Sequence, residues 1–253
     1  MAGRGQIAFH SGSLFVKDTS SAIPTPIQVA TLQEVSFDFK ASNKSLFGEN
    51  QFAEAVGRGN TTITGKAKSG RFNGKLLNQI FFNQPSANQI SGAKLLAIDE
   101  SGTVATATVT VANAANFSED LGVQNPATGV AYTRVAATPA AGQYSVNEST
   151  GVYTFNASEN STALKFSYLY KTTATGSGTQ LITNQAAGEA PTFRGIFSQK
   201  FQGKTMTLIL NALVSESLGF AFKNEDFSMP EFSFAAQVDT AGALGELSMT
   251  SFS

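Results

Sequence analysis

The 253-residue chain carries 17 Lys and Arg against 18 Asp and Glu, so its formal net charge is −1, and charged residues make up only 14% of it. Soluble domains average about 25% charged residues. A nearly neutral, weakly charged surface favours association, so we expect an assembly without electrostatic binding to nucleic acid. The absence of cysteine excludes disulfides and thiolate metal sites. No apolar run reaches the about 20 residues of a membrane helix, and the N-terminal residues lack a secretory pattern, so we expect no membrane partner.

Alternation of apolar and polar residues, the pattern of a strand with one buried face, is the dominant signal along the chain. It predicts strands at six places, which are residues 31–40, 62–68, 105–111, 164–170, 206–214 and 232–239. Turn residues at 148–151 and 202–204 predict two hairpins. In the second predicted strand, Gly65 indicates a bulge or a close backbone approach.

One segment departs from alternation and predicts a helix near residues 73–82. Its apolar residues follow helical spacing and are Leu76, Leu77, Ile80 and Phe81. Asn73 is placed to cap the first turn, Phe72 to pack on Leu77, and Pro85 to end the segment. Because so short a helix is marginal in water, its apolar side must lie against a sheet. The predicted fold class is therefore all-β with one packed α-helix, an antiparallel β-sandwich or barrel.

The composition changes between residues 99 and 171, where Ala, Thr, Asn and Val dominate and Lys and Arg are scarce. A run typical of flexible linkers follows at residues 172–180. We interpret 99–171 as a small β module inserted between two parts of a main domain, residues 1–98 and 172–253. An equally weighted alternative makes these residues ordinary strands of one larger sandwich.

Few residues suggest catalysis or metal binding. The single histidine, His10, has no second histidine with which to share a metal, so a surface or packing role is favoured, and its role stays open. Three acidic pairs, at residues 99–100, 119–120 and 225–226, consist of neighbours that point apart on an extended chain, and acidity of turns is the favoured explanation. We therefore expect no enzyme, no catalytic residues, no metal site and no cofactor.

The order of the segments points to a family. Residues 35–48 read VSFDFKASNKSLFG, residues 51–72 read QFAEAVGRGNTTITGKAKSGRF, and the predicted helix follows. This succession of strand, Lys-x-Leu-Phe-Gly turn, second strand and helix resembles the N-terminal half of the major tail tube proteins of long-tailed bacteriophages. Residues 142–155 and 164–170 are similar to the outer β insert of some members, and the resemblance returns at residues 190–239.

The resemblance implies a structural virion protein located in the tail and synthesised in the host cytoplasm. Family members form stacked rings, commonly hexameric, whose subunits contribute strands to one inner β-barrel around a channel for DNA ejection. The implied partners are identical subunits within and between rings, a tape-measure protein, tail-end caps, and DNA that passes through the lumen without specific binding. Closing strands around a ring also removes the exposed sheet edges that alternating strands leave.

Candidate lumen or inter-subunit positions lie on the polar faces of the first two long strands. They are Ser36, Asp38, Lys40, Thr62, Thr64, Lys66 and Lys68. A DNA channel should not be net basic, because Lys and Arg would bind passing phosphates. The second strand is basic, so its lysines either face outward, pair with acidic residues of a neighbour, or belong to strands that do not line the lumen.

Two further hypotheses stay open. The first is that the chain is the tube subunit of a contractile injection or secretion system. The second, from another class of protein, is that the chain is a β-sandwich adhesin or sugar-binding protein. The composition of the Thr- and Asn-rich module is similar to that of such proteins, but the absence of tryptophan argues against this hypothesis. Residues 1–30 and 220–231 are weakly patterned and are interpreted as arms ordered by neighbouring rings.

Overall fold

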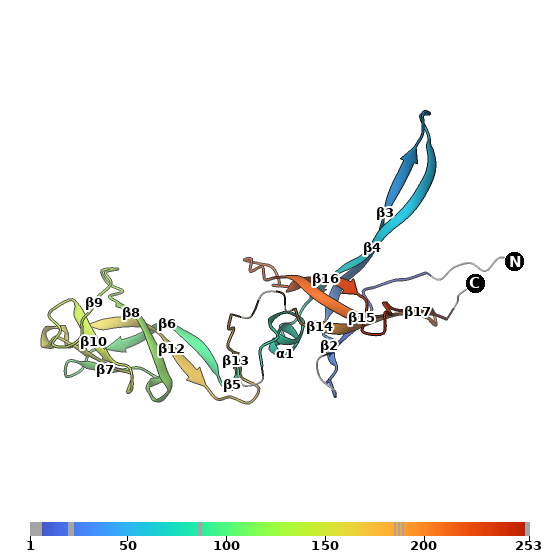
Figure 1. The fold of residues 1–253 in the computed structure, drawn as a ribbon. Coiled ribbons are helices and arrows are strands. Elements are labelled where there is room, and N and C mark those ends of the chain that lie inside the picture. The colour runs from blue at the N-terminus through green and yellow to red at the C-terminus, as the bar shows by residue number, and fades with distance from the viewer. Residues whose placement is uncertain are drawn as a thin grey trace. The chain divides into compact units, whose positions relative to one another are not determined.

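A computed structural model describes residues 7–19, 23–85, 88–184, 186, 188 and 190–250. Strands dominate, and nearly all of them pair antiparallel, which confirms the all-β fold class (Figure 1). The chain forms two compact units: unit 1 contains the chain up to Gln84 and from Ile182 onward, and unit 2 is Pro85–Leu181. Each unit has its own hydrophobic core. The boundaries expected at residues 99 and 171 fall inside unit 2.

Unit 1 is built on one eight-stranded sheet. Its strands are β1 (Ser13–Asp18), β2 (Ile27–Val29), β3 (Leu32–Phe47), β4 (Ala53–Ser69), β14 (Thr192–Phe201), β15 (Lys204–Gly219), β16 (Glu231–Gln237) and β17 (Gly245–Met249). The order is β2-β1-β14-β15-β16-β4-β3, and β17 pairs with β15 beside β16. Among the described residues the sheet does not close into a barrel: its path ends at β2 and β3, and β17, which pairs only with β15, is a further edge strand. The four strands predicted in this unit are confirmed, and β3, β4 and β15 extend well beyond the predictions.

Local chemistry explains the hairpin that joins β14 to β15. Gln202 and Gly203 form its two-residue turn and both have positive φ, 49° and 77°. This geometry matches the right-handed twist of the flanking strands. The predicted turn at residues 202–204 is therefore confirmed, although Lys204 itself is already the first residue of β15.

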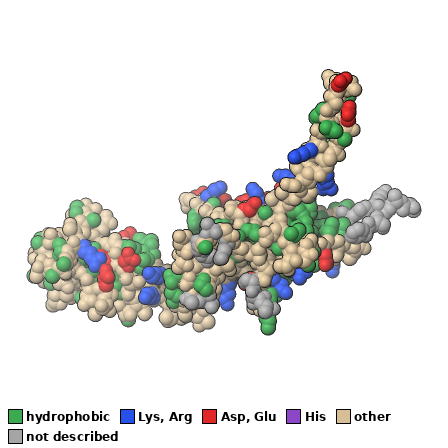
Figure 2. Space-filling model, in the orientation of Figure 1, with side chains coloured by type: hydrophobic (Ala, Val, Ile, Leu, Met, Phe, Trp, Pro, Cys, Tyr) green, Lys and Arg blue, Asp and Glu red, His purple; other side chains and the backbone are tan. Residues whose placement is uncertain are grey.

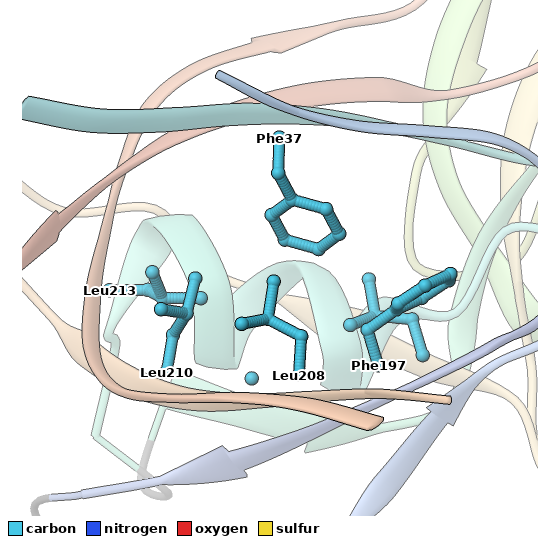
Figure 3. A pocket seen from close by; sticks show the side chains of 7 residues that line it. Phe37, Phe197, Leu208, Leu210 and Leu213 are labelled. Carbon is cyan, nitrogen blue, oxygen red and sulfur yellow. The ribbon is translucent and has the colours of Figure 1, made fainter. Parts of the chain in front are cut away.

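The core of unit 1 lies between the inner face of the sheet and the helical segment. Figure 3 shows Phe37 of β3 pointing toward Leu208 of β15 and Phe197 of β14, beside Leu210 and Leu213. The rings of Phe37 and Phe197 are 5.5 Å apart at their centroids. The void among these side chains is only about 10 Å³ and has an apolar lining. It is at the lower limit for one water molecule, and it offers that water no polar side chain, so it is a packing gap and not a ligand site.

The predicted helix is present but irregular. It consists of α1 (Gly74–Leu77) followed directly by the π-helical turn η1 (Asn78–Phe82). Asn73 Oδ1 accepts hydrogen bonds from Lys75 N at 3.1 Å and Leu76 N at 3.2 Å, which confirms the predicted cap. The segment ends where Asn83 adopts a left-handed φ of 43° and donates to Asn78 O at 2.7 Å. The end therefore precedes Pro85, which was expected to cause it.

The apolar side of this helix is narrower than its spacing indicates. Leu76 and Ile80 are buried in the core of unit 1, but Phe81 is 38% exposed. Phe81 lies within the π turn, whose wider winding changes the angular position of its residues, so Phe81 does not continue the buried stripe. Phe72 was expected to pack on Leu77. Its ring instead stacks on those of Phe220 and Phe222, which lie just beyond the end of β15.

Unit 2 contains three small sheets. The first has the strand order β6 (Ala93–Thr103), β12 (Ala163–Thr172), β8 (Phe117–Gln124). The second has the order β7 (Thr108–Thr110), β11 (Val152–Phe155), β10 (Gln143–Asn147), β9 (Thr133–Arg134). The third pairs β5 (Gln89–Ser91) with β13 (Gly178–Gln180). Two 3₁₀ turns are η3 (Ala114–Asn116) and η4 (Ala157–Glu159). The predicted strand at 164–170 and the turn at 148–151 are confirmed.

Two sequence-based expectations in unit 2 are wrong. The strand predicted at residues 105–111 is reduced to β7, because Thr106 and Ala107 have positive φ, 48° and 59°, and form a turn. The run at 172–180 is also not a plain linker, since residues 178–180 pair with β5. In the second case long-range pairing, which composition does not report, decides the local structure. None of the described helices has the length and apolar character needed to span a bilayer.

Candidate assembly surface

The seven predicted polar residues of β3 and β4 lie on one face of the sheet. Ser36 pairs with Lys66, Asp38 with Thr64 and Lys40 with Thr62 across an uninterrupted register, and Lys68 pairs with Glu34 one step further along. Directly paired residues share a face because side chains alternate along each strand. The opposite face carries the buried Ile63, Gly65 and Ala67, which belong to the core side.

Strand β16 continues this polar face. Glu231 pairs with Lys68, and Ser233 pairs with Lys66. Lys68 therefore lies between two carboxylates on neighbouring strands, with Nζ at 2.9 Å from Glu34 Oε2 and at 3.5 Å from Glu231 Oε2. The hydrogen bond to Glu34, followed by the charge of Glu231, raises the pKa of Lys68 above its ordinary value. The lysine stays charged at neutral pH and is neutralised by residues of its own chain.

The charges on this three-stranded face balance. Its acidic members are Glu34, Asp38 and Glu231, and its basic members are Lys40, Lys66 and Lys68. The basic excess seen along β4 alone disappears once the strands on either side of it are included. An array of this kind offers polar contacts to a polyanion without net attraction, because affinity for phosphates grows with the number of cations they neutralise.

The outer half of the β3–β4 hairpin extends past the core of its own unit (Figure 1). From Asp38 to Thr62 every residue is exposed except the half-buried Ala53. The exposed side chains include large apolar ones, Phe39, Leu46, Phe47, Phe52 and Val56. An isolated two-stranded ribbon is at best marginally stable in water. Within the described part of the chain nothing covers this ribbon, so its apolar side chains form an exposed surface.

A buried carboxylate organises the core of unit 2. The Asp120 side chain is 2% exposed, and its two oxygens accept hydrogen bonds from Tyr153 OH and Tyr144 OH, each at 2.8 Å. Gly122 N donates to it at 3.1 Å, and Arg134 Nη1 lies 3.6 Å away. Burial, and then the hydrogen bonds to Asp120, raise the pKa of both phenols well above the ordinary value. The phenols therefore remain protonated donors.

Two further carboxylates of unit 2 hold tyrosines in the same way. Glu100 accepts from Tyr168 OH and from Ala112 N, the latter at 2.7 Å. Glu159 accepts from Tyr132 OH at 2.6 Å and is part of η4. Burial is the main cause that raises the pKa of Tyr168 and Tyr132.

The explanation of the acidic pairs by turns is therefore wrong for two of the three. Glu100 belongs to β6 and Asp120 to β8, and only residues 225–226 lie in a turn. No sequence signal marks these carboxylates as phenol acceptors, because their tyrosines come from other strands. Their partners are structural groups of the core, and the geometry suggests no acid–base pair acting on a substrate.

His10 and the described part of the N-terminal segment differ from the predicted arm, which was to be ordered by neighbouring rings. His10 is exposed, has a φ of 65°, and its ring meets that of Phe9 edge-on at 5.7 Å. Phe9 O accepts from Gln199 Nε2 at 2.8 Å, and β1 and β2 belong to the sheet of their own chain. Residues 1–6 and 20–22 of that arm lie outside the described residues. Among those described, no group of three potential metal ligands comes together.

The sequence matches no protein-family model, and a search of curated proteins finds no significant match either.

Proposed function

We propose that this chain is a structural virion protein, the major tail tube subunit of a long-tailed bacteriophage, whose copies form stacked hexameric rings around a channel for DNA ejection. The observation that supports this most strongly is the long β3–β4 hairpin, which leaves the core at Asp38 and Thr62 with exposed apolar side chains. A ribbon of this kind is stabilised by other copies and would otherwise be a site of aggregation.

Ring closure accounts for the open sheet of unit 1. The two strands that end its path, β2 and β3, present unpaired backbone groups. Pairing edges of successive subunits would satisfy these groups and produce an inter-subunit barrel of the tail-tube type. A ring made in this way uses the same surface patches on every subunit in heterologous contacts, which close when the rotation divides a full turn.

The balanced polar face of β3, β4 and β16 suits the wall of such a channel. Its three acidic and three basic side chains allow DNA to slide without being retained. In this proposal unit 2 is the inserted outer module, and the further partners are a tape-measure protein and tail-end caps. A tube of a contractile injection or secretion system would use the same surfaces, and a sheath protein that binds the assembled tube would identify that variant of the proposal.

An adhesin or sugar-binding function has less support. Sugar platforms use exposed aromatic rings. Three of the five tyrosines, Tyr144, Tyr153 and Tyr168, are buried in the core of unit 2.

Negative-stain microscopy of the purified full-length chain tests the proposal. Rings or tubes with a central bore are expected. The matched control replaces residues 42–60 by an Asn-Gly turn between Ala41 and Thr61, which are paired in the hairpin. This variant should keep the circular dichroism and melting temperature of a folded chain but form no tubes. A wild-type chain that stays monomeric and binds glycans would contradict the proposal and support an adhesin.

A further inference from the structure

The chain contains a single Asn-Gly sequence, Asn73-Gly74, at the start of α1. Asparagine is a chemically labile residue. It loses its side-chain ammonia most readily when glycine follows, because glycine has no Cβ to hinder the backbone nitrogen that attacks the amide. Both residues are exposed to solvent, so the sequence is open to this reaction in the folded chain.

The attacking atom, Gly74 N, is free to react. Gly74 is the first residue of α1, and the first N–H groups of a helix have no acceptor within it. The cap leaves this nitrogen unused, since Asn73 Oδ1 accepts from Lys75 N and Leu76 N. No hydrogen bond of Gly74 N is found among the described residues. A Cβ added to Gly74 would meet no atom of another part of the chain within 4 Å, so the space around it is open.

The cap slows the reaction without blocking it. Asn73 has a ψ of 107°, an extended conformation that holds Gly74 N away from Cγ of the side chain. Ring closure therefore requires rotation about this bond and loss of the two cap hydrogen bonds. The rotation disturbs only an exposed segment. The chain is fixed before it, where Ser69 Oγ donates to Arg71 O at 2.9 Å, and after it, where the side chain of Leu76 is buried.

We propose that Asn73 deamidates spontaneously in the folded chain, so that the protein slowly converts a neutral helix cap into a charged one. Gly74 N attacks Cγ of Asn73 and gives its proton to the solvent, while Nδ2 takes up a proton and leaves as ammonia. These steps close a five-membered imide. The site lies outside the polar face of β3, β4 and β16, and the inference does not rest on the proposed function.

One water molecule then opens the imide in either of two ways. Addition at Cγ breaks the bond between Cγ and Gly74 N and gives aspartate. Addition at the main-chain carbonyl carbon of residue 73 breaks the bond between that carbon and Gly74 N. The second route gives isoaspartate, which is linked to Gly74 through Cγ.

The two products affect the cap differently. Aspartate keeps the oxygen that accepts from Lys75 N and Leu76 N, and Asp and Asn are equally good N-caps. Its new charge lies along the chain between Arg71 and Lys75, two exposed cations for which no ion pair is found among the described residues. Isoaspartate adds a carbon to the main chain and displaces the capping oxygen. The folded chain should therefore form a larger share of aspartate than the unfolded chain.

The change of charge is considerable for this protein. Charged residues make up only 14% of the chain, and Figure 2 shows their side chains sparse and scattered on the visible face. Deamidation adds one negative charge to a formal net charge of −1. Ion-exchange chromatography should therefore separate the modified chain from the unmodified one.

Mass spectrometry of the aged full-length chain tests the proposal. At mildly alkaline pH, which favours removal of the proton from Gly74 N, the peptide containing Asn73 should gain about 1 Da. In water enriched in oxygen-18 it should also incorporate one heavy oxygen atom. Asn160, whose Oδ1 accepts from Ala107 N at 2.8 Å, is the internal control and should remain an amide. A peptide of Asn73 that keeps its mass in the folded chain, while the same peptide is converted in urea, would overturn the proposal.

Gly74→Ala is the matched variant. Gly74 does not have a positive φ and the added Cβ has room, so the melting temperature should not fall. Conversion should slow on the order of tenfold, because the Cβ hinders the attacking nitrogen. Equal rates in this variant and the wild type would overturn the assignment to Asn73-Gly74.

Two substitutions of Asn73 test the effect on the cap. Asn73→Asp should match the main product of the folded chain in ion exchange and keep the wild-type melting temperature, whereas Asn73→Ala should melt earlier. The shares of aspartate and isoaspartate are then compared between folded and urea-unfolded chains. Equal shares would disprove that the cap selects the product.

Discussion

Gln84 and Thr183 hold together the two points at which the chain leaves and re-enters unit 1. Gln84 Nε2 donates to Thr183 O at 3.2 Å, and Thr183 Oγ1 donates to Gln84 Oε1 at 2.7 Å. Gln84 is itself buried and fixed by Asn78, whose side chain donates to Gln84 O and accepts from Gln84 N. All of unit 2 is thus inserted between two adjacent points of unit 1.

Removal of residues 85–181 should therefore leave unit 1 folded. With Gln84 joined to Ile182 through a short Gly-Ser linker, we expect a cooperative unfolding transition and, under the proposed function, tubes of smaller outer diameter. Microscopy and circular dichroism measure the two properties. A narrower deletion of residues 103–172 is the matched control: it removes β12 but keeps most of β6, whose exposed edge should cause aggregation. Unfolding of the wider deletion would show that the units depend on each other.

Gly65→Ala should destabilise unit 1. A Cβ at this position would lie 2.5 Å from two ring carbons of Phe234 and 2.7 Å from Ser36 O. Such overpacking costs about 1–3 kcal/mol in the free energy of unfolding, which urea denaturation measures. Gly57→Ala, in the outer part of the same strand, meets its nearest atom only at 3.9 Å and should change that free energy little. Equal effects of the two substitutions would disprove the close contact with Phe234.

Tyr153→Phe should destabilise unit 2 because it removes a donor from the buried carboxylate of Asp120. Hydrogen bonds to charged groups contribute about 1.5–3 kcal/mol, so a loss near 2 kcal/mol is expected. All five tyrosines lie in unit 2 and the chain has no tryptophan, so tyrosine fluorescence during urea unfolding reports on this unit. Tyr170→Phe is the control, because no hydrogen bond of the Tyr170 hydroxyl is found among the described residues. A smaller effect at Tyr153 than at Tyr170 would contradict this role for Asp120.

Unit 2 should lose stability at alkaline pH. The pKa of Tyr144 and Tyr153 is raised in the fold above the ordinary 10.0, chiefly by burial. Above pH 10 the unfolded chain releases these protons while the folded chain retains them, so the stabilisation that is complete below pH 10 declines as the pH rises. Each phenol contributes a slope of about 1.4 kcal/mol per pH unit. Urea titrations at stepped pH should show a flatter decline for the Tyr144→Phe, Tyr153→Phe double variant, and equal slopes would refute the shifts.

The polar face of β3, β4 and β16 should be inaccessible to large reagents in an assembled tube. Ser36→Cys introduces a unique thiol on this face, at the position paired with Lys66. We expect N-ethylmaleimide to label it in tubes and a maleimide attached to a large polyethylene glycol to label it only after disassembly. Ser149→Cys in unit 2 should react with both reagents in both states. Labelling of Ser36→Cys in tubes by the large reagent would place this face outside the channel.

The sequence by itself determined the features that depend on neighbouring residues. Alternation predicted the strands of unit 1, since side chains on successive residues point to opposite faces. Asn73 was identified as a helix cap and residues 202–204 as a turn, because capping and turn geometry involve only a few consecutive residues. The close backbone approach predicted for Gly65 is also confirmed, because a Cβ there would lie 2.7 Å from Ser36 O; the contact with the ring of Phe234 could not be named from sequence.

Only the tertiary structure decided which distant residues meet and which surfaces stay open. Glu34, Lys68 and Glu231 neutralise one another across three strands, and this pairing turns a basic strand into a balanced face. The alternating pattern of β3 continues beyond Asp38 as far as Ala41, so it cannot show that the core ends at Asp38. The physical reason is common to both cases: periodicity fixes the direction of each side chain, whereas the partner that it meets depends on how the whole sheet is paired.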